Sequence, residues 1–322
     1  MLYCKALQCL DLKQMQIYAL IVYMKSNIRF KSPWSQLVLF LGLLLSFVIL
    51  ANAVVAIILL AKGLISTGQK TLDLSDPKLI EAFKSMQVIY TLIGFLLPAL
   101  VYSWITFNYR SLYFLGFGPS QKFNFYILAI LLMIISLPLA YWFGQLNEHM
   151  PLAKWMIDAE KDASKQMEAF VKTNSTREIM LNLLIIGLIP AICEEACFRG
   201  ALQRILINIS KSPWIGITLA AVFFSAFHMQ FEGFLPRMFL GMMLGALYWY
   251  SGSLWVSITA HFFNNASQLI MIVYYPQLAD ENPTVPVYAA VASALVVWGI
   301  LLLIKRQSKS DYHTTYDFQA MK

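Results

Sequence analysis

Residues 181–202 read LNLLIIGLIPAICEEACFRGAL, an apolar stretch long enough to cross a lipid bilayer that nevertheless contains two adjacent glutamates and an arginine. A membrane-spanning helix needs about 20 mostly apolar residues. A charged side chain at the bilayer centre costs about 2.5–3.5 kcal/mol on insertion scales. We therefore expect Glu194 and Glu195 to have a function that offsets this cost.

The composition of the whole chain agrees with a membrane environment. The 322 residues are 59% hydrophobic and 13% charged, and the mean hydropathy is +0.64. Soluble domains carry about 25% charged residues, so this chain has too few to cover a water-facing surface. We predict an all-α, polytopic membrane helix bundle with the lipid bilayer as its solvent.

Outward from residues 181–202, the apolar pattern predicts about eight transmembrane helices. They lie near residues 35–61, 87–107, 123–145, 178–203, 213–230, 234–250, 254–275 and 286–304. The polar connection 147–176 contains an amphipathic pattern at Trp155–Val171, which predicts an interfacial helix or, alternatively, a lid.

These spans divide the chain into four parts. They are a cytoplasmic leader (1–33), three spans with polar loops (34–176), a core (177–275), and a last span with a cytoplasmic tail (276–322). Met24 would serve equally well as a start, because it opens a basic leader into the first span. Residues 1–23 therefore carry no weight in the prediction.

The distribution of charge predicts the orientation. With the N-terminus inside, eight spans return the C-terminus to the inside, and the inner connections are basic without acidic residues. The basic residues of these connections are Lys25, Arg29, Lys31, Arg110, Lys122, Arg204, Lys211, Lys305, Arg306 and Lys309. The net charge of +7 is thus a topology signal that requires no nucleic acid. We predict a protein of the cell (inner) membrane with both termini cytoplasmic.

The spacing of charges in the fourth span predicts different roles for the two glutamates. Arg199 follows Glu195 by four residues, so the two lie on one helix face and can form a charge-assisted pair. Glu194 points about 100° away and has no obvious partner on its helix. One carboxylate is predicted to be held in place, while its neighbour is free to act as a general base.

Two later spans contain histidines. His228 ends the fifth predicted span, and His261 lies in the seventh, four residues before Asn265. Polar side chains in such segments normally face the bundle interior or a water-filled cavity. Counting 1.5 Å per residue from the inner boundary, however, puts His228 roughly 10 Å farther out than Glu194 and His261.

Three motifs in order carry a family resemblance. They are Glu194-Glu195-x-x-x-Arg199, Phe224-x-x-x-His228 and His261-x-x-x-Asn265. This arrangement, over roughly residues 178–272, resembles the CPBP (Abi) family of intramembrane proteases, which includes the CAAX prenyl endopeptidases. The resemblance implies a multi-helix bundle that encloses a water-accessible cavity and cleaves peptides close to a membrane anchor.

The same resemblance implies roles for individual residues. Glu194 and His228 would activate the attacking water. His261 and Asn265 would bind the oxyanion. The neighbouring pair of Glu195 with Arg199 would support the first carboxylate, and Phe224 is interpreted as a packing residue.

A bound metal is the alternative to a metal-free mechanism. Glu194, His228 and His261 would make a His/His/Glu zinc site with one open position, and Asn265 would then be the acceptor that orients His261. The chain has no His-Glu-x-x-His motif. Asn265 suits an oxyanion hole better than a zinc site, so the favoured prediction is a water activated by glutamate without a cofactor.

Two classes other than proteases stay open. One is a non-catalytic membrane protein of the bacteriocin-immunity type, which the complete set of motifs disfavours. The other is a proton-coupled transporter, disfavoured because paired broken helices in two repeated halves are absent. For the favoured class, the expected partner is a membrane-anchored peptide or protein substrate, and nothing in the sequence marks a prenyl pocket.

Overall fold

The structure is a computed structural model whose described residues form helices joined by short connections. It describes residues 32–64, 77–107, 111–120, 122–171, 175–275 and 283–311. Within these ranges no strand occurs, so the predicted all-α class is confirmed. The predictions for residues 1–31, including that on the start of the chain, and for residues 312–322 lie outside the described residues.

The helices of the first half surround the glutamate-bearing segment. They are α3 (Pro33–Ala61), α4 (Pro77–Thr91), the π-helical η2 (Leu92–Leu96), α5 (Leu97–Phe107), α6 (Ser111–Leu115), α7 (Asn124–Glu148) and α8 (Lys154–Val171). α4, η2 and α5 form one continuous helix. The amphipathic pattern at Trp155–Val171 is confirmed as α8, whereas the short α6 was not predicted.

The second half contains the motifs. Its elements are α9 (Thr176–Asn182), η4 (Leu183–Leu188), α10 (Ile189–Glu194), η5 (Glu195–Gln203), α11 (Arg204–Ser210), α12 (Pro213–Phe227), α13 (Phe234–Ser251), α14 (Leu254–Tyr274) and α15 (Val287–Gln307). The segment from α9 to α11 is one continuous helix. It is interrupted by two π-helical stretches, which often mark functional sites and which the helical periodicity did not predict.

All eight predicted apolar segments are helical, and among the described residues five helices are long and apolar enough to cross a membrane. These five are Pro33–Ala61, Leu79–Thr106, Asn124–Glu148, Thr176–Ser210 and Val287–Gln307. α12 is apolar but has only 15 residues, or about 22 Å of helix. The membrane bundle is therefore confirmed, and the count of eight spans stays a prediction.

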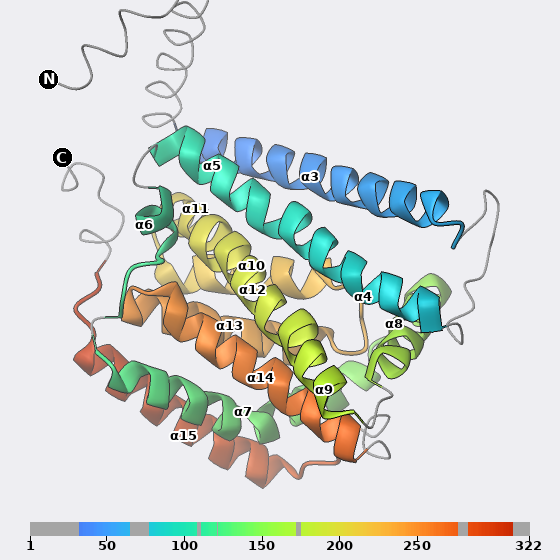
Figure 1. Cartoon of the computed structure of the whole chain (residues 1–322). Coiled ribbons are helices and arrows are strands. Elements are labelled where there is room, and N and C mark those ends of the chain that lie inside the picture. Colours follow the sequence, from blue (N-terminus) through green and yellow to red (C-terminus); the bar gives the residue numbers. More distant parts are fainter. Residues whose placement is uncertain are drawn as a thin grey trace, which may run out of the picture.

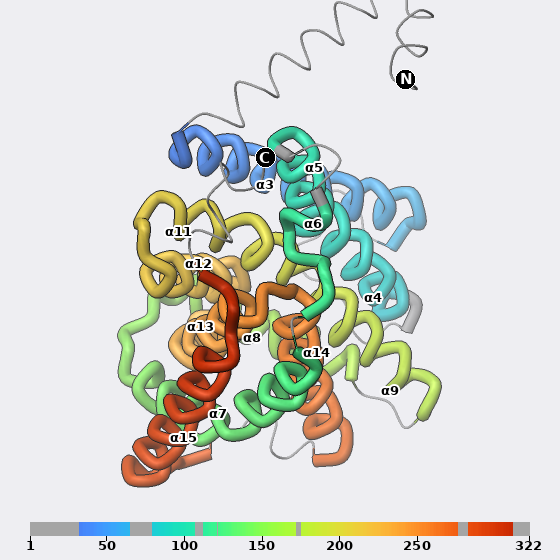
Figure 2. Tube along the Cα trace, turned by 90° about the vertical axis from the view of Figure 1, so that its left-hand side faces the viewer, coloured from blue at the N-terminus to red at the C-terminus, as the bar shows by residue number. Residues whose placement is uncertain are grey.

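The helices that carry the motifs lie between two outer groups (Figure 1). α3 packs against α5 and η2 on one side, and α7 packs against α15 on the other. Between them, α12 packs against α13, and α14 contacts both α7 and η4. Figure 2, turned by 90°, shows α12 beside α13 from a second direction. The motif residues thus lie in the interior of the bundle.

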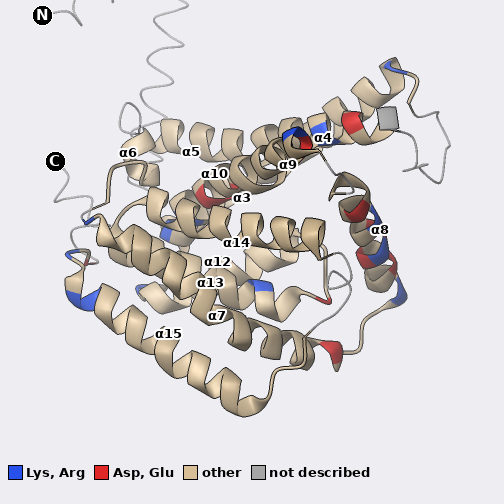
Figure 3. Cartoon of the chain, turned by 60° about the horizontal axis from the view of Figure 1, so that its bottom comes forward, with Lys and Arg blue, Asp and Glu red and all other residues tan. Residues whose placement is uncertain are grey.

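Charged residues gather at the two ends of the bundle (Figure 3). At one end, basic residues lie near the end of α15 and the connection into α7, where Asn124 Nδ2 donates to Gln307 Oε1 over 2.5 Å. At the opposite end, around α8, acidic residues lie together with lysines. The basic end of α15 and the basic connection into α7 therefore lie at the same end of the bundle. This is expected if Lys and Arg mark one side of the membrane.

Candidate active site

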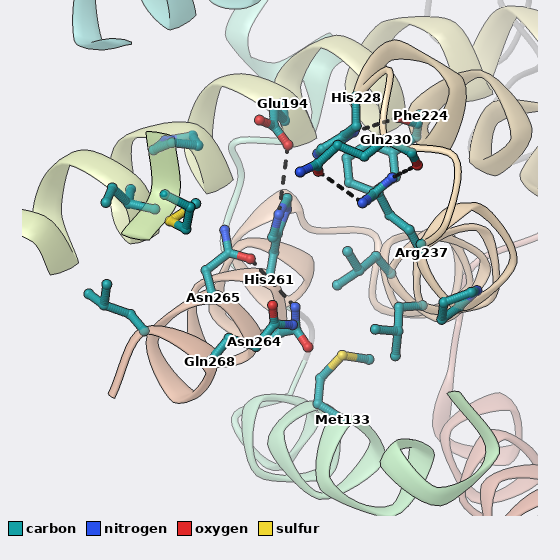
Figure 4. A pocket seen from close by; sticks show the side chains of 18 of the residues that line it. Met133, Glu194, Phe224, His228, Gln230, Arg237, His261, Asn264, Asn265 and Gln268 are labelled. Atoms are coloured by element: carbon teal, nitrogen blue, oxygen red, sulfur yellow. Dashed lines mark hydrogen bonds and ion pairs between the residues drawn. The ribbon is translucent and has the colours of Figure 1, made fainter. Parts of the chain in front are cut away.

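A cavity of about 430 Å³ lies in the interior of the helix bundle. Glu194, His228, His261 and Asn265 all line it, and Figure 4 shows side chains from three parts of the chain converging there. Its volume falls within the usual range for small-ligand sites. The depth count for His228 was therefore misleading, because residues counted along one helix do not measure depth when helices tilt and cross.

The predicted ion pair forms the closed side of the site. Arg199 Nη1 donates to Glu195 Oε1 over 2.6 Å, and both side chains are buried. Arg199 Nη2 donates to the carbonyl of Gly241 on α13 over 3.1 Å. A Cβ at position 241 would lie 3.3 Å from Nη2 and 3.2 Å from Phe224, so glycine permits this close approach of α13.

Glu195 also holds His261, which the sequence did not predict. His261 Nδ1 lies 2.8 Å from Glu195 Oε1, the same oxygen that accepts from Arg199. Since a carboxylate paired with arginine only accepts, Nδ1 carries a proton, and Nε2 is the ring nitrogen left for the cavity. In the zinc alternative Asn265 would orient His261, whereas in the structure Glu195 is the acceptor at Nδ1 of that ring.

Glu194 is the less restrained of the two glutamates. Its side chain is 13% exposed, and its Oε2 lies 3.8 Å from His261 Nε2. That separation is too long for a direct hydrogen bond. The placement agrees with the predicted free carboxylate, while the role of Glu194 stays a prediction.

His228 is oriented by its own helix. Its Nδ1 lies 2.8 Å from the carbonyl oxygen of Phe224, which can only accept, so Nδ1 carries a proton and neutral His228 has an unprotonated Nε2. The Phe224 ring packs against both imidazoles, with centroid separations of 4.8 Å to His228 and 5.7 Å to His261. Phe224 thus contacts both histidines, which agrees with its interpretation as a packing residue.

The connection that begins at His228 is held by a side chain from another helix. Asn147 at the end of α7 donates to the carbonyl of Phe231 over 2.7 Å and accepts from the backbone N–H of Leu235 over 2.8 Å. Ser225 donates to the carbonyl of Phe234 over 2.7 Å. These bonds satisfy backbone groups that have no partner in a regular helix, and they stabilise the wall of the cavity.

The sequence interpretation missed Arg237 and Gln230, which line the same cavity. Arg237 is the one charged residue in the predicted span 234–250. A charge within an apolar span indicates a functional residue, as it did for Glu194. Asn265 lines the cavity as expected, with Asn264 Nδ2 at 3.5 Å from its Oδ1. Its oxyanion-binding role stays a prediction.

The arrangement does not match a metal centre. Within the part of the chain that the structure describes, no three His, Cys, Asp or Glu side chains are grouped as metal ligands. Glu194 and His261 approach each other, whereas His228 contacts the carbonyl oxygen and the ring of Phe224. The buried thiols of Cys193 and Cys197 do not complete a ligand set either. The steps considered below therefore use no metal.

Comparison with known proteins bears on the same part of the chain. Residues 176–267 match the family model described as type II CAAX prenyl endopeptidase Rce1-like. The protein YpbD of Bacillus subtilis (strain 168), which bears the description "uncharacterized", is 30% identical over 122 residues. This alignment covers 36% of the present chain and 57% of YpbD. No solved structure matches. The resemblance inferred from the three motifs is confirmed for the core, and it supports a CAAX protease-like function in general terms.

Proposed function

We propose that this chain, whose core matches the type II CAAX prenyl endopeptidases, is an intramembrane endopeptidase. Its substrate would be a membrane-associated protein or peptide. The observation that carries the proposal is that Glu194, His228 and His261 share one cavity beside a buried ion-pair network. The family match supports the same reaction class.

The first step of the proposed reaction activates water. Glu194 takes a proton from a water molecule, and the unprotonated Nε2 of His228 accepts that water's second hydrogen bond. The hydroxide so formed attacks the carbonyl carbon of the scissile peptide bond. Glu194 then returns the proton to the departing amine, so no cofactor is consumed.

The second requirement is stabilisation of the negative oxygen in the tetrahedral intermediate. Asn265 Nδ2 and His261 Nε2 would donate to it, and His261 can do so only with protons on both ring nitrogens. Glu195 lies beside Nδ1 of that ring and is paired through the same carboxylate oxygen with Arg199. These two residues position His261 and do not themselves touch the substrate.

The proposed location follows from the charge distribution. The basic end of the bundle would face the cytoplasm, with both termini on that side of the cell membrane. The cavity lies between helices that are apolar on their outer faces, so a substrate would be tethered in the bilayer. No nucleic acid is expected as a partner.

Reconstitution in vesicles tests the proposal. A pool of acylated peptides of varied sequence would be incorporated with the protein into phosphatidylethanolamine–phosphatidylglycerol vesicles, and products would be identified by mass spectrometry. We expect cleavage by the wild type and by Glu168→Gln, a matched change on the exposed face of α8. Glu194→Gln should yield no products. Binding of peptides without cleavage by the wild type would instead favour a non-catalytic immunity-type protein.

A further inference from the structure

Arg237 places a positive charge in the cavity wall, separate from the ion pair already described. It lies in the first turn of α13, is half-buried, and lines the cavity with Glu194 and His228 (Figure 4). The water activation and oxyanion binding proposed above do not use it. A charged side chain inside a membrane bundle is a functional candidate for the same energetic reason as Glu194.

The partners of Arg237 differ from those of Arg199. Arg237 Nη1 donates to the carbonyl of Gln230 over 2.9 Å, and Nη2 donates to Gln230 Oε1 over 3.0 Å. Both acceptors are neutral, and among the described residues no carboxylate lies within ion-pair distance of the guanidinium. Arg199, in contrast, has the carboxylate of Glu195 at 2.6 Å.

The backbone near Arg237 is shaped to seat the guanidinium. A Cβ at position 233 would lie 2.9 Å from Arg237 Nη2, so a larger residue than Gly233 would displace the side chain. Gln230 clamps the group from the same connection. A guanidinium offers more N–H donors than the two that Gln230 occupies, and its planar fork matches a carboxylate.

We propose that Arg237, oriented by Gln230, binds the free C-terminal carboxylate of the peptide substrate. This inference rests on the proposed peptidase function and adds a specificity-determining residue to it. A cavity of about 430 Å³ holds a short segment only, and both Glu194 and Arg237 line it, so the end of a chain that is cut beside Glu194 can lie at Arg237. Glu160 and Glu194 act on Arg237 only from beyond ion-pair distance, and the substrate's carboxylate supplies the contacting negative charge that the described residues do not.

If Arg237 served only to balance charge, substitution of Arg237 would change cleavage rates in a different way. If it only balanced the charge of Glu194 from a distance, its loss would slow every substrate alike. If it binds the substrate's carboxylate, its loss slows peptides with a free C-terminus selectively. The ratio of rates for two forms of one peptide therefore separates the two roles.

The test compares three forms of an anchored peptide in the vesicles described above. One ends in a free carboxylate and one in a carboxamide. The third ends in a glutamate whose α-carboxyl group is amidated, so that its side chain carries the carboxylate. We expect the wild type to prefer the free acid over the carboxamide by about 10- to 100-fold in kcat/KM. Arg237→Gln should bring this ratio near one, and Arg237→Lys should retain part of it.

Arg306→Gln is the matched control, because Arg306 is exposed on α15 outside this cavity, and it should keep the wild-type ratio. A wild-type ratio near one would overturn the inference. So would equal slowing of both forms by Arg237→Gln. Equal cleavage of the free acid and the glutamate-ended carboxamide would overturn the assignment to the C-terminus.

Binding separates failure of this inference from failure of the proposed function. In Glu194→Gln, fluorescence anisotropy of a labelled peptide should show tighter binding of the free acid than of the carboxamide, and Arg237→Gln in that background should abolish the difference. Such binding without cleavage by any wild-type preparation would reject the peptidase and keep the carboxylate site. Cleavage that ignores the C-terminal group would keep the peptidase and reject the site.

Discussion

On one side of His261 the candidate active site is closed, and on the other side it is open. On the closed side, Glu195, Arg199 and His261 are joined through a single carboxylate oxygen and are buried. On the open side, Glu194 and Arg237 line the cavity without a carboxylate–guanidinium contact between them. The two sides begin at adjacent residues of one helix.

This difference indicates how a membrane protein can hold reactive charges. A buried charge is tolerated when it is paired and hydrogen-bonded, and removal of one partner leaves an uncompensated charge. Changes on the closed side should therefore act mainly on folding. Changes on the open side should act mainly on reaction and binding, and this contrast can be tested by substitution.

The largest expected effect is on the open side, at Glu194. Glu194→Gln keeps the shape of the side chain but removes the proposed base, so cleavage should fall by about 10²–10⁴-fold. Thermal unfolding in detergent should remain near the wild-type temperature, because the side chain is partly exposed and has no direct hydrogen bond among the described residues. Substantial remaining activity would reject the assignment.

On the closed side, loss of Glu195 or of Arg199 should destabilise the protein by about 3–5 kcal/mol. Replacing both by apolar residues of similar size should recover part of that loss. The measurement is a double-mutant cycle on unfolding free energy. Simple additivity of the two single changes would contradict the pairing seen at 2.6 Å.

Asn265→Asp tests the oxyanion-binding role on the open side. The change puts a negative charge beside the developing oxyanion, so kcat should fall by about 10²-fold, the usual scale for such a donor. KM should change much less. An unchanged kcat would remove Asn265 from the reaction, whatever the outcome at Glu194.

A smaller effect is expected at Asn147, which supports the open side from α7. Asn147→Leu leaves the N–H of Leu235 without its partner and removes one of the two donors to the carbonyl of Phe231, at about 1–3 kcal/mol. Both stability and rate should fall. Asn124→Leu, which removes an exposed contact with Gln307, should change neither by as much.

The smallest expected effect is that of chelation. Purified protein should contain less than one equivalent of metal, and its cleavage rate should survive treatment with a chelator. Metal analysis and a rate measurement before and after chelation check this. One tightly bound zinc, with activity lost on removal and restored by zinc, would replace the water-activating glutamate mechanism with a metal-based one.

The sequence was most informative within single helices. The pairing of Glu195 with Arg199 was predictable because residues four apart share a helix face. It was least informative between helices. Glu195 and His261 are 66 residues apart in the sequence, so helical periodicity does not predict their contact. Periodicity likewise does not predict that Arg237 lines the cavity.

By itself, the sequence determined the membrane environment, the helical class and the residues that belong in the interior, because hydropathy and charge cost act on each segment separately. Only the tertiary structure decided which nitrogen of each histidine is engaged and which glutamate is left at the cavity. Those outcomes depend on where α10, α13 and α14 cross. Crossing positions arise from side-chain packing between helices, which no repeat within one helix encodes.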